Sequence, residues 1–201
     1  MKLDKYWKIE ELFPKNFFNR HSKLVAPDLI GCYLIKKNNE EDKVKGVIVE
    51  TEAYSQEEEA CHGYRKMTES NKSLFGIPGT FYIYKSYGIH HCLNIVTDKE
   101  NFASGVLIRS VFISEKNERL ASGPGLVTKT FNVDISFNSL EVFNNKSLWI
   151  SPRESTLEEK DLIQTTRIGI SKAKNIKWRW YLKNSRSVSK RLKGDKTPKF
   201  Q

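Results

Sequence analysis

The chain has 201 residues, of which 38% are hydrophobic and 29% are charged, and it includes 11 Phe, 8 Tyr and 4 Trp. This composition excludes general disorder and allows a domain with its own core. No apolar run approaches the roughly 18 residues of a membrane span, and the first residues lack the apolar core of a signal peptide, so we expect a cytoplasmic protein. Three unevenly spaced cysteines, Cys32, Cys61 and Cys92, fit reduced thiols better than a disulfide framework.

We predict one α+β domain over residues 1–184, centred on a curved antiparallel β-sheet with short peripheral helices, followed by a basic, flexible tail over residues 185–201. Successive short apolar runs separated by turn residues favour hairpins over long helices. In the first half of the chain, we expect a helix over 4–13, an apolar segment over 24–30 leading to a strand over 33–35, and a turn over 38–45 before the strand that contains Glu52. A helical turn over 68–74 and a hairpin of 81–84 with 92–96 follow. In the second half, we expect a strand over 105–113, a helix over 115–120, a turn at 123–125, and strands over 148–150 and 167–170.

The net charge of +10 lies in the carboxyl-terminal part of the chain. Residues 171–201 hold eleven Lys or Arg and one acid, whereas the rest of the chain is neutral. Trp178, Trp180 and Tyr181 lie among these bases, and such interleaving is typical of a surface that binds a polyanion. Nucleic acid is the polyanion we expect, and a solvated lysine-rich tail is the alternative.

The strand that contains Glu52 carries two acids without an evident structural reason. Side chains alternate in a strand, so Glu50, Glu52 and Tyr54 share one face, while Val49 and Ala53 share the other, which we expect to be buried. Two carboxylates roughly 6 to 7 Å apart repel each other unless a cation, a hydrogen bond or water intervenes. Taken alone, this segment favours a solvated strand face.

Further motifs follow Glu52 in a fixed order, and together they support a resemblance. The residues are Glu52-Ala53-Tyr54, His62, Pro78-Gly79-Thr80-Phe81-Tyr82-Ile83-Tyr84, Tyr87-Gly88, Asn94, Arg109 and Gly123-Pro124-Gly125. Over about residues 24–181 the chain resembles the alkyladenine DNA glycosylases, the methylpurine family of 3-methyladenine DNA glycosylases. The resemblance implies a monomeric, monofunctional base-excision-repair enzyme that hydrolyses the N-glycosidic bond of purines flipped out of duplex DNA. It implies alkylated or deaminated substrates (3-methyladenine, 7-methylguanine, hypoxanthine, ethenoadenine), no metal, no organic cofactor and association with the nucleoid in a bacterium.

The resemblance assigns the catalytic step to Glu52 and Arg109. Glu52 would be the general base that deprotonates a water aimed at C1′ of the sugar, and its charge would stabilise an oxocarbenium-like transition state. Arg109 would position that water and keep Glu52 ionised. The family gives no catalytic role for Glu50, to which we assign a structural one, so the two acids are not a two-carboxylate glycosidase pair.

The resemblance also implies how the base is held. Tyr54 and Tyr84 would stack on the two faces of the flipped base, and His62 would read its edge. Asn94 would crowd the exocyclic amino group of guanine and so exclude this normal base. Tyr87, at the tip of a DNA-inserting β-hairpin, would fill the space that the extruded nucleotide leaves.

The match has three departures. The loop between Tyr54 and His62 is one residue shorter than in the family, and Leu126 occupies a position where the family commonly has Lys. The carboxyl-terminal basic segment has no family role, and we expect it to bind phosphates non-specifically. Our candidates for contact with the DNA backbone are Lys172, Lys177 and Arg179.

Two other classes of function compete with this interpretation. A metal enzyme would use the donors of Cys61-His62 and 90–92, but side chains of adjacent strand residues diverge, so we expect no metal site. A non-catalytic protein that recognises DNA damage would flip or wedge DNA without cutting a bond. Glu52 and Arg109 argue against it, because recognition alone needs neither a base nor a water.

Overall fold

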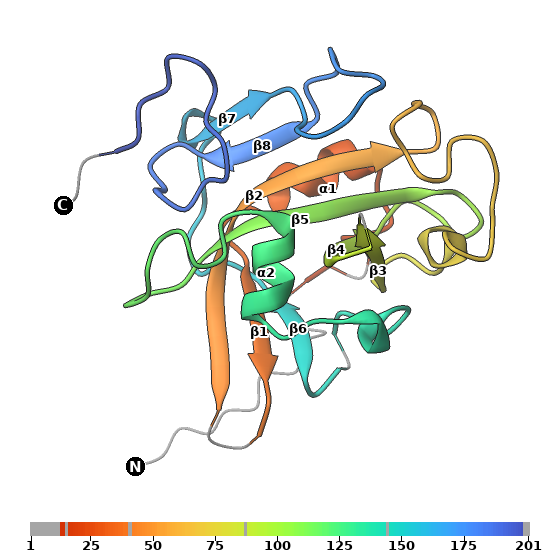
Figure 1. Cartoon of the computed structure of the whole chain (residues 1–201), viewed down its shortest axis with the longest axis horizontal. Helices are drawn as coiled ribbons and strands as arrows, with labels where there is room; N and C mark the ends of the chain where they lie inside the picture. The colour runs from red at the N-terminus through yellow and green to blue at the C-terminus, as the bar shows by residue number, and fades with distance from the viewer. Residues whose placement is uncertain (1–12, 15, 40–41, 87, 144, 199–201) are drawn as a thin grey trace.

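A curved antiparallel sheet of eight strands is the framework of the protein (Figure 1). The computed structural model describes residues 13–14, 16–39, 42–86, 88–143 and 145–198. The six strands of the main path lie in the order β3-β4-β5-β2-β1-β6, and β8 pairs with both β2 and β7. The strands are β1 (Tyr33–Lys37), β2 (Lys43–Ser55), β3 (Phe81–Ser86), β4 (His90–Val96), β5 (Ser104–Phe112), β6 (Leu148–Ser151), β7 (Leu162–Thr165) and β8 (Arg179–Leu182).

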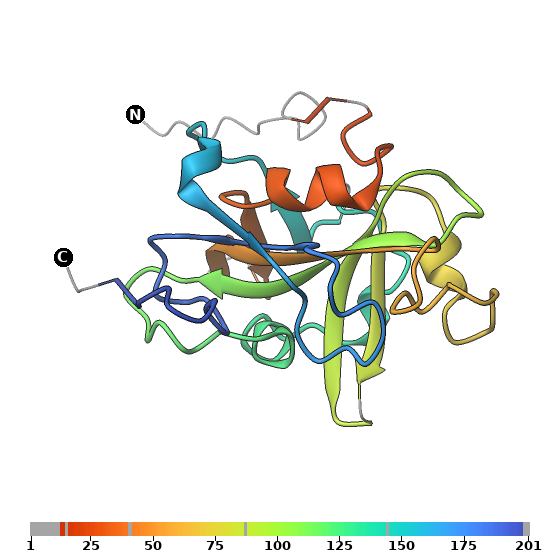
Figure 2. The same ribbon diagram turned by 90° about the horizontal axis from the view of Figure 1, so that it is seen from above.

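The long strand β2 lies at the centre of this sheet. One edge of β2 pairs with β5, and its other edge pairs first with β1 and then, over Glu50–Glu52, with β8. Helix α1 (Ser22–Asp28) packs on β2, while α2 (Pro124–Thr130) packs on β4 and β5. The two helices cover opposite faces of the sheet (Figure 2). Residues 48–53 are therefore buried on both faces, and the prediction of a solvated face for Glu50 and Glu52 is wrong.

The predicted hairpins are confirmed. β1 and β2 pair antiparallel, with the polar segment after Lys37 as their connection. β3 and β4 pair from Phe81↔Ile95 to Ser86↔His90. Figure 2 shows this second hairpin projecting from one side of the sheet. Gly88 near its tip has a φ of +69°, which glycine adopts without strain. Tyr87 and most of the predicted helix over 4–13 lie outside the described residues.

Three local predictions after β5 are wrong. Residues 115–120 form turns instead of a helix, and Glu115 has a positive φ of 60°. The predicted turn at 123–125 is the start of α2, where Pro124 occupies the first turn, a position that proline favours because its missing N–H has no partner there. The strand predicted over 167–170 lies earlier, at β7, and those residues form a loop.

The boundary predicted at residue 184 stays a prediction, but the structure shows how the chain continues after it. Ser187 and Val188 are buried, so the first residues of the predicted tail pack against the domain instead of forming a flexible segment. Within the described parts of the chain, no helix is long and apolar enough to cross a membrane.

The hydrophobic core joins α2 to the sheet, and this gives a test of the fold. Phe131, directly after α2, is 0% exposed within the main core cluster, whereas Leu126 on the same helix is 42% exposed. Phe131→Ala is expected to lower the free energy of unfolding by about 3–5 kcal/mol, because it leaves a cavity. The control Leu126→Ala should change it by no more than about 0.5 kcal/mol. Urea denaturation of both variants measures the difference, and equal midpoints would contradict the packing of α2.

Candidate active site

A cavity of about 380 Å³ lies where β2 to β5 meet the loop after β7. Such a volume is within the range of small-molecule sites. Five of the residues predicted from the sequence line it together, although they come from four strands and one loop of the chain. These are Tyr54, His62, Tyr84, Asn94 and Arg109.

Glu52 lies immediately behind this lining and is 0% exposed. Its Oε2 accepts hydrogen bonds from the Tyr54 hydroxyl at 2.8 Å and from Nη1 of Arg109 at 3.2 Å. Its Oε1 accepts one from the backbone N–H of Ile168 at 2.7 Å. A carboxylate offers about four acceptor positions, so these three bonds leave one, on Oε1. Tyr54, Arg109 and Ile168 all line the cavity, so the Glu52 carboxylate lies one side chain behind it.

Arg109 owes its orientation to an irregularity in the pairing of β2 with β5. The register passes from Glu50↔Ser110 to Thr51↔Ile108, so Arg109 is an extra residue on β5. A bulge of this kind re-aims a side chain, and bulges are common next to active sites. Consecutive residues Arg109 and Ser110 consequently both contact Glu50, which the regular alternation of a strand does not allow.

The charge states of Arg109 and Tyr54 follow from their surroundings. Burial alone would lower the pKa of Arg109, but the charges of Glu52 and Glu50 together raise it, so the guanidinium stays a cation. Burial and the Glu52 carboxylate raise the pKa of Tyr54 well above its ordinary value. Tyr54 therefore keeps its proton and is the donor in its bond to Glu52.

Three aromatic rings form one wall of the cavity. Nδ1 of His62 lies 3.0 Å from the Tyr82 hydroxyl, and the His62 ring meets the edge of Tyr84 with 4.4 Å between centroids. Tyr82 and Tyr84 stack with centroids 5.5 Å apart. Partial desolvation lowers the pKa of His62, so the imidazole is neutral at neutral pH and its Nε2 remains for a ligand. His62 thus reaches the cavity despite the shortened loop.

Asn94, which pairs with Tyr82 in the β3–β4 hairpin, is fixed in the lining by backbone groups of that hairpin. Its Nδ2 donates to the carbonyl oxygens of Tyr82 at 3.1 Å and Cys92 at 3.3 Å. Both amide hydrogens are therefore used by the backbone. What Asn94 offers to a ligand in the cavity is its carbonyl oxygen, Oδ1.

Sequence reasoning missed Arg167 and Glu58, which support Tyr54 from behind. Arg167 donates to both carboxylate oxygens of Glu58, at 2.6 and 2.8 Å, and to the carbonyl oxygen of Ala53 at 2.9 Å. Its guanidinium lies 4.6 Å from the centroid of the Tyr54 ring. Glu58 is 6% exposed although it belongs to an acidic run that predicts a solvated loop. An arginine within the apolar run 167–170 was the only sequence signal for this pair.

Glu50 and Arg179 form a second buried pair. Nη1 of Arg179 lies 2.7 Å from Oε1 of Glu50, and Arg179 also donates to the carbonyl oxygens of Thr166 and Lys190. Arg179 is 3% exposed, so its assignment to the DNA backbone is corrected: strand β8 directs it into the protein. Lys172 and Lys177, in the loop before β8, are exposed and stay candidates for phosphate contact.

No group of three or more His, Cys, Asp or Glu side chains that could hold a metal ion is found among the residues that the structure describes. The three cysteines are buried and unpaired, and burial raises the pKa of Cys32 and Cys61 to about 11. These thiols are consequently protonated at neutral pH.

Comparisons with known proteins give the family of this chain. The sequence model of the methylpurine-DNA glycosylase family matches residues 16–186. The chain therefore belongs to this family.

Two relatives from different bacteria carry the name "Putative 3-methyladenine DNA glycosylase". One, from Trichodesmium erythraeum, is 40% identical over 197 residues, which is 90% of this chain and 98% of the relative. The other, from Carboxydothermus hydrogenoformans, is 41% identical over 192 residues, which is 90% of this chain and 100% of the relative.

The Arg167–Glu58 pair gives a test of the support behind Tyr54. Arg167→Met is expected to lower the free energy of unfolding by about 3–5 kcal/mol, because it leaves the Glu58 carboxylate buried without its partner. Lys72→Met, which breaks the exposed pair with Glu69, is the control and should leave the unfolding midpoint unchanged. Urea denaturation measures both variants, and a wild-type midpoint for Arg167→Met would refute the role of the pair.

Proposed function

We propose that the protein excises alkylated and deaminated purines, including 3-methyladenine, 7-methylguanine, hypoxanthine and ethenoadenine, from duplex DNA after flipping the nucleotide out of the helix. The observation that carries the proposal is the one open acceptor position of the buried Glu52 carboxylate, beside an aromatic cavity. A water held there would lie between Glu52 and a base in the cavity. The proposed reaction uses water and side chains alone, in a monomer, and no step requires a metal or an organic cofactor.

Hydrolysis would proceed at C1′ of the flipped nucleotide. Glu52 takes a proton from the water while the water oxygen forms a bond to C1′. The purine leaves with the electron pair of the broken N-glycosidic bond. The negative charge of Glu52 stabilises the positive charge that develops on the sugar. Arg109, which is held as a cation, keeps Glu52 in its ionised form and orients the water.

Base flipping is supported by the composition of the cavity wall. Extruding a nucleotide costs a few kcal/mol, and stacking on an aromatic side chain is worth about 1–3 kcal/mol per base. Tyr54 and Tyr84 both face the cavity and can offset this cost. The β3–β4 hairpin supplies Tyr84 and Asn94 to the cavity lining and projects from the sheet (Figure 2), so it would place Tyr87 in the DNA double helix.

Selection among purines would rest on His62 and Asn94. A neutral His62 can donate or accept at Nε2, depending on the tautomer that the Tyr82 hydroxyl favours. Asn94, whose amide is fixed by the backbone, would crowd the amino group of guanine and exclude it.

The central test uses duplex DNA treated with dimethyl sulfate, which carries cationic methylpurines, and duplexes with one hypoxanthine or ethenoadenine. The wild type is expected to release free bases, and Glu52→Gln should reduce the rate at least a hundredfold while DNA binding persists. Glu154→Gln, at an exposed position (76%), is the matched control and should retain the wild-type rate. Chromatography of the released bases measures the outcome. Binding without release by the wild type would overturn the proposal in favour of a recognition protein.

The proposed binding of DNA phosphates by Lys172 and Lys177 gives a second test. The double variant Lys172→Ala/Lys177→Ala should bind duplex DNA more weakly, and the slope of log K against log salt should become shallower by about 0.9 for each phosphate that the variant no longer neutralises. Lys43→Ala/Lys45→Ala, in the hairpin of β1 and β2, is the control. Fluorescence anisotropy titrations at several KCl concentrations measure the slope, and an unchanged slope would refute the role of the two lysines. Deletion after residue 184 is not a clean alternative, because it removes buried residues.

A further inference from the structure

Arg109 is shared by two buried carboxylates. Its Nη1 lies 3.2 Å from Oε2 of Glu52, and its Nε lies 3.4 Å from Oε1 of Glu50. The Nε is buried and donates no hydrogen bond within the described structure. Both contacts are long for charge-assisted hydrogen bonds, which are usually about 2.7–2.9 Å. Small changes around either carboxylate can therefore move Arg109 toward the other.

Glu50, unlike Glu52, has no acceptor position left. Its Oε1 accepts from Arg179 at 2.7 Å and from the Ser189 hydroxyl at 2.9 Å. Its Oε2 accepts from the Ser110 hydroxyl at 2.8 Å and from the backbone N–H of Ser189 at 2.7 Å. With four of about four positions filled, Glu50 cannot hold a water or act as a base. The cluster contains two carboxylates and two guanidinium groups, so its net charge is zero.

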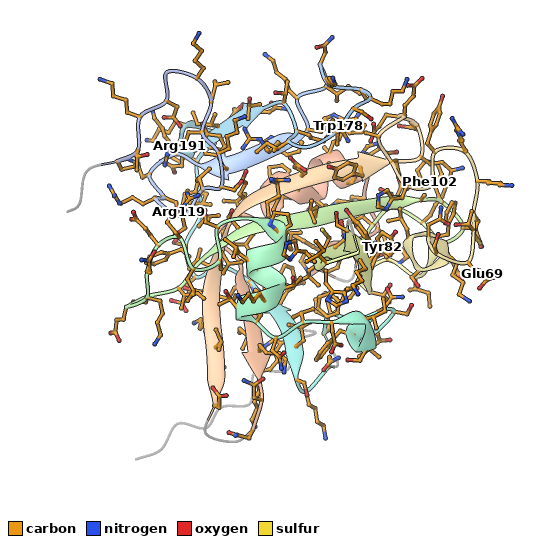
Figure 3. The ribbon with its side chains drawn as sticks, viewed as in Figure 1. Glu69, Tyr82, Phe102, Arg119, Trp178 and Arg191 are labelled. Carbon is orange, nitrogen blue, oxygen red and sulfur yellow. The ribbon has the colours of Figure 1, made fainter. Side chains whose placement is uncertain are left out.

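The segment that brings Ser189 to Glu50 is fixed by the rest of the protein. Arg119 donates to the carbonyl oxygens of Val188 at 3.0 Å and Ser189 at 3.5 Å, and Arg179 donates to that of Lys190 at 2.7 Å. Figure 3 shows Arg119 and Arg191 on the side of the molecule where this segment lies. The carboxyl-terminal segment is thus tied to the interior charges of the sheet.

We infer that Glu50, Arg179 and Ser189 are positioning residues for Arg109. Arg179 and Ser189 satisfy the Glu50 carboxylate, which prevents Glu50 from drawing Arg109 away from Glu52. Glu50 in turn takes part of the attraction of Arg109, so that Arg109 is not drawn onto Glu52 alone. The carboxyl-terminal segment therefore sets the activity of Glu52 from a distance. This inference rests on the proposed role of Glu52.

The other titratable groups that face the cluster keep one charge state in the acid range. They are Tyr54 from β2, Tyr84 from β3, Cys92 from β4 and Tyr181 from β8, whose ring lies 5.3 Å from the Arg179 guanidinium. Burial raises the pKa of each of them, and the charge of Glu52 adds to the increase for the first three, so all four are neutral there. A change in the acid side of the rate–pH profile therefore reports the two carboxylates and two arginines.

The test is the pH at which the single-turnover rate falls on the acid side, measured with DNA methylated by dimethyl sulfate. Glu50→Gln frees Arg109 to approach Glu52, which favours the carboxylate, so the fall should move to lower pH by about one unit. Arg179→Gln leaves Glu50 to draw Arg109 away, so the fall should move to higher pH by a similar amount. Misfolding that is equal at every pH does not produce such a shift, because only active molecules contribute to the rate, and circular dichroism at each pH measures whether the folded fraction stays constant.

Two further variants test whether Arg179 acts through Glu50. Arg179→Gln added to Glu50→Gln should cause no additional shift, whereas independent charge effects would add. Arg179→Lys keeps the charge and should restore the wild-type profile. Arg191→Gln is the matched control, because Arg191 lies in the same segment but pairs with Asp195, and its profile should match the wild type.

The outcomes distinguish a failure of the positioning role from a failure of the proposed function. The positioning role would be overturned if the rates of Glu50→Gln and Arg179→Gln fell at the same acid pH as the rate of the wild type. It would also be overturned if the two shifts added in the double variant. If the wild type releases no methylpurines, the proposed function itself fails, and if the wild type and Glu52→Gln release them at the same rate, the proposed role of Glu52 fails. The two failures are therefore separate observations.

Discussion

The burial of two carboxylates on one strand is the constraint on which the rest of the structure depends. An ionised carboxylate without a partner is very costly in a protein interior. Glu50 and Glu52 are both 0% exposed, so each needs cations and hydrogen-bond donors from other parts of the chain. The bulge that aims Arg109, the pairing of β8 with β2 and the course of the carboxyl-terminal segment all meet this need.

The same environment gives the two acids different chemistry. All acceptor positions of Glu50 are filled; burial would raise its pKa, but Arg109, Ser189 and Arg179 lower it below its ordinary value. Glu50 therefore stabilises the folded state above its unfolded pKa, and this contribution is lost as the pH falls through the lowered value. Glu52 keeps one acceptor position free beside the cavity. A buried glutamate with a free position can hold a water, and one without it is a structural anchor.

The structure separates the groups for chemistry from those for recognition. Glu52 and Arg109 lie on the two central strands, where packing on both faces holds their geometry. Tyr84 and Asn94 come from the projecting hairpin, and His62 comes from a loop. Rigid elements thus carry the groups that we propose for catalysis, while the more peripheral ones shape the cavity that we propose for the base. The buried pair of Arg167 and Glu58 joins the two parts by supporting Tyr54.

The sequence determined the features that follow from local hydrophobic pattern and from motifs in a fixed order along the chain. It predicted the two hairpins, the curved antiparallel sheet, and the set of residues from Glu52 to Arg109 that lines or adjoins one cavity. It did not predict the environment of Glu50, because alternation fixes which side chains share a face but not what covers that face. The Arg179 that pairs with Glu50 is 129 residues away in the chain. Only the tertiary structure brought these charges together, since a buried carboxylate selects its partners by distance in space.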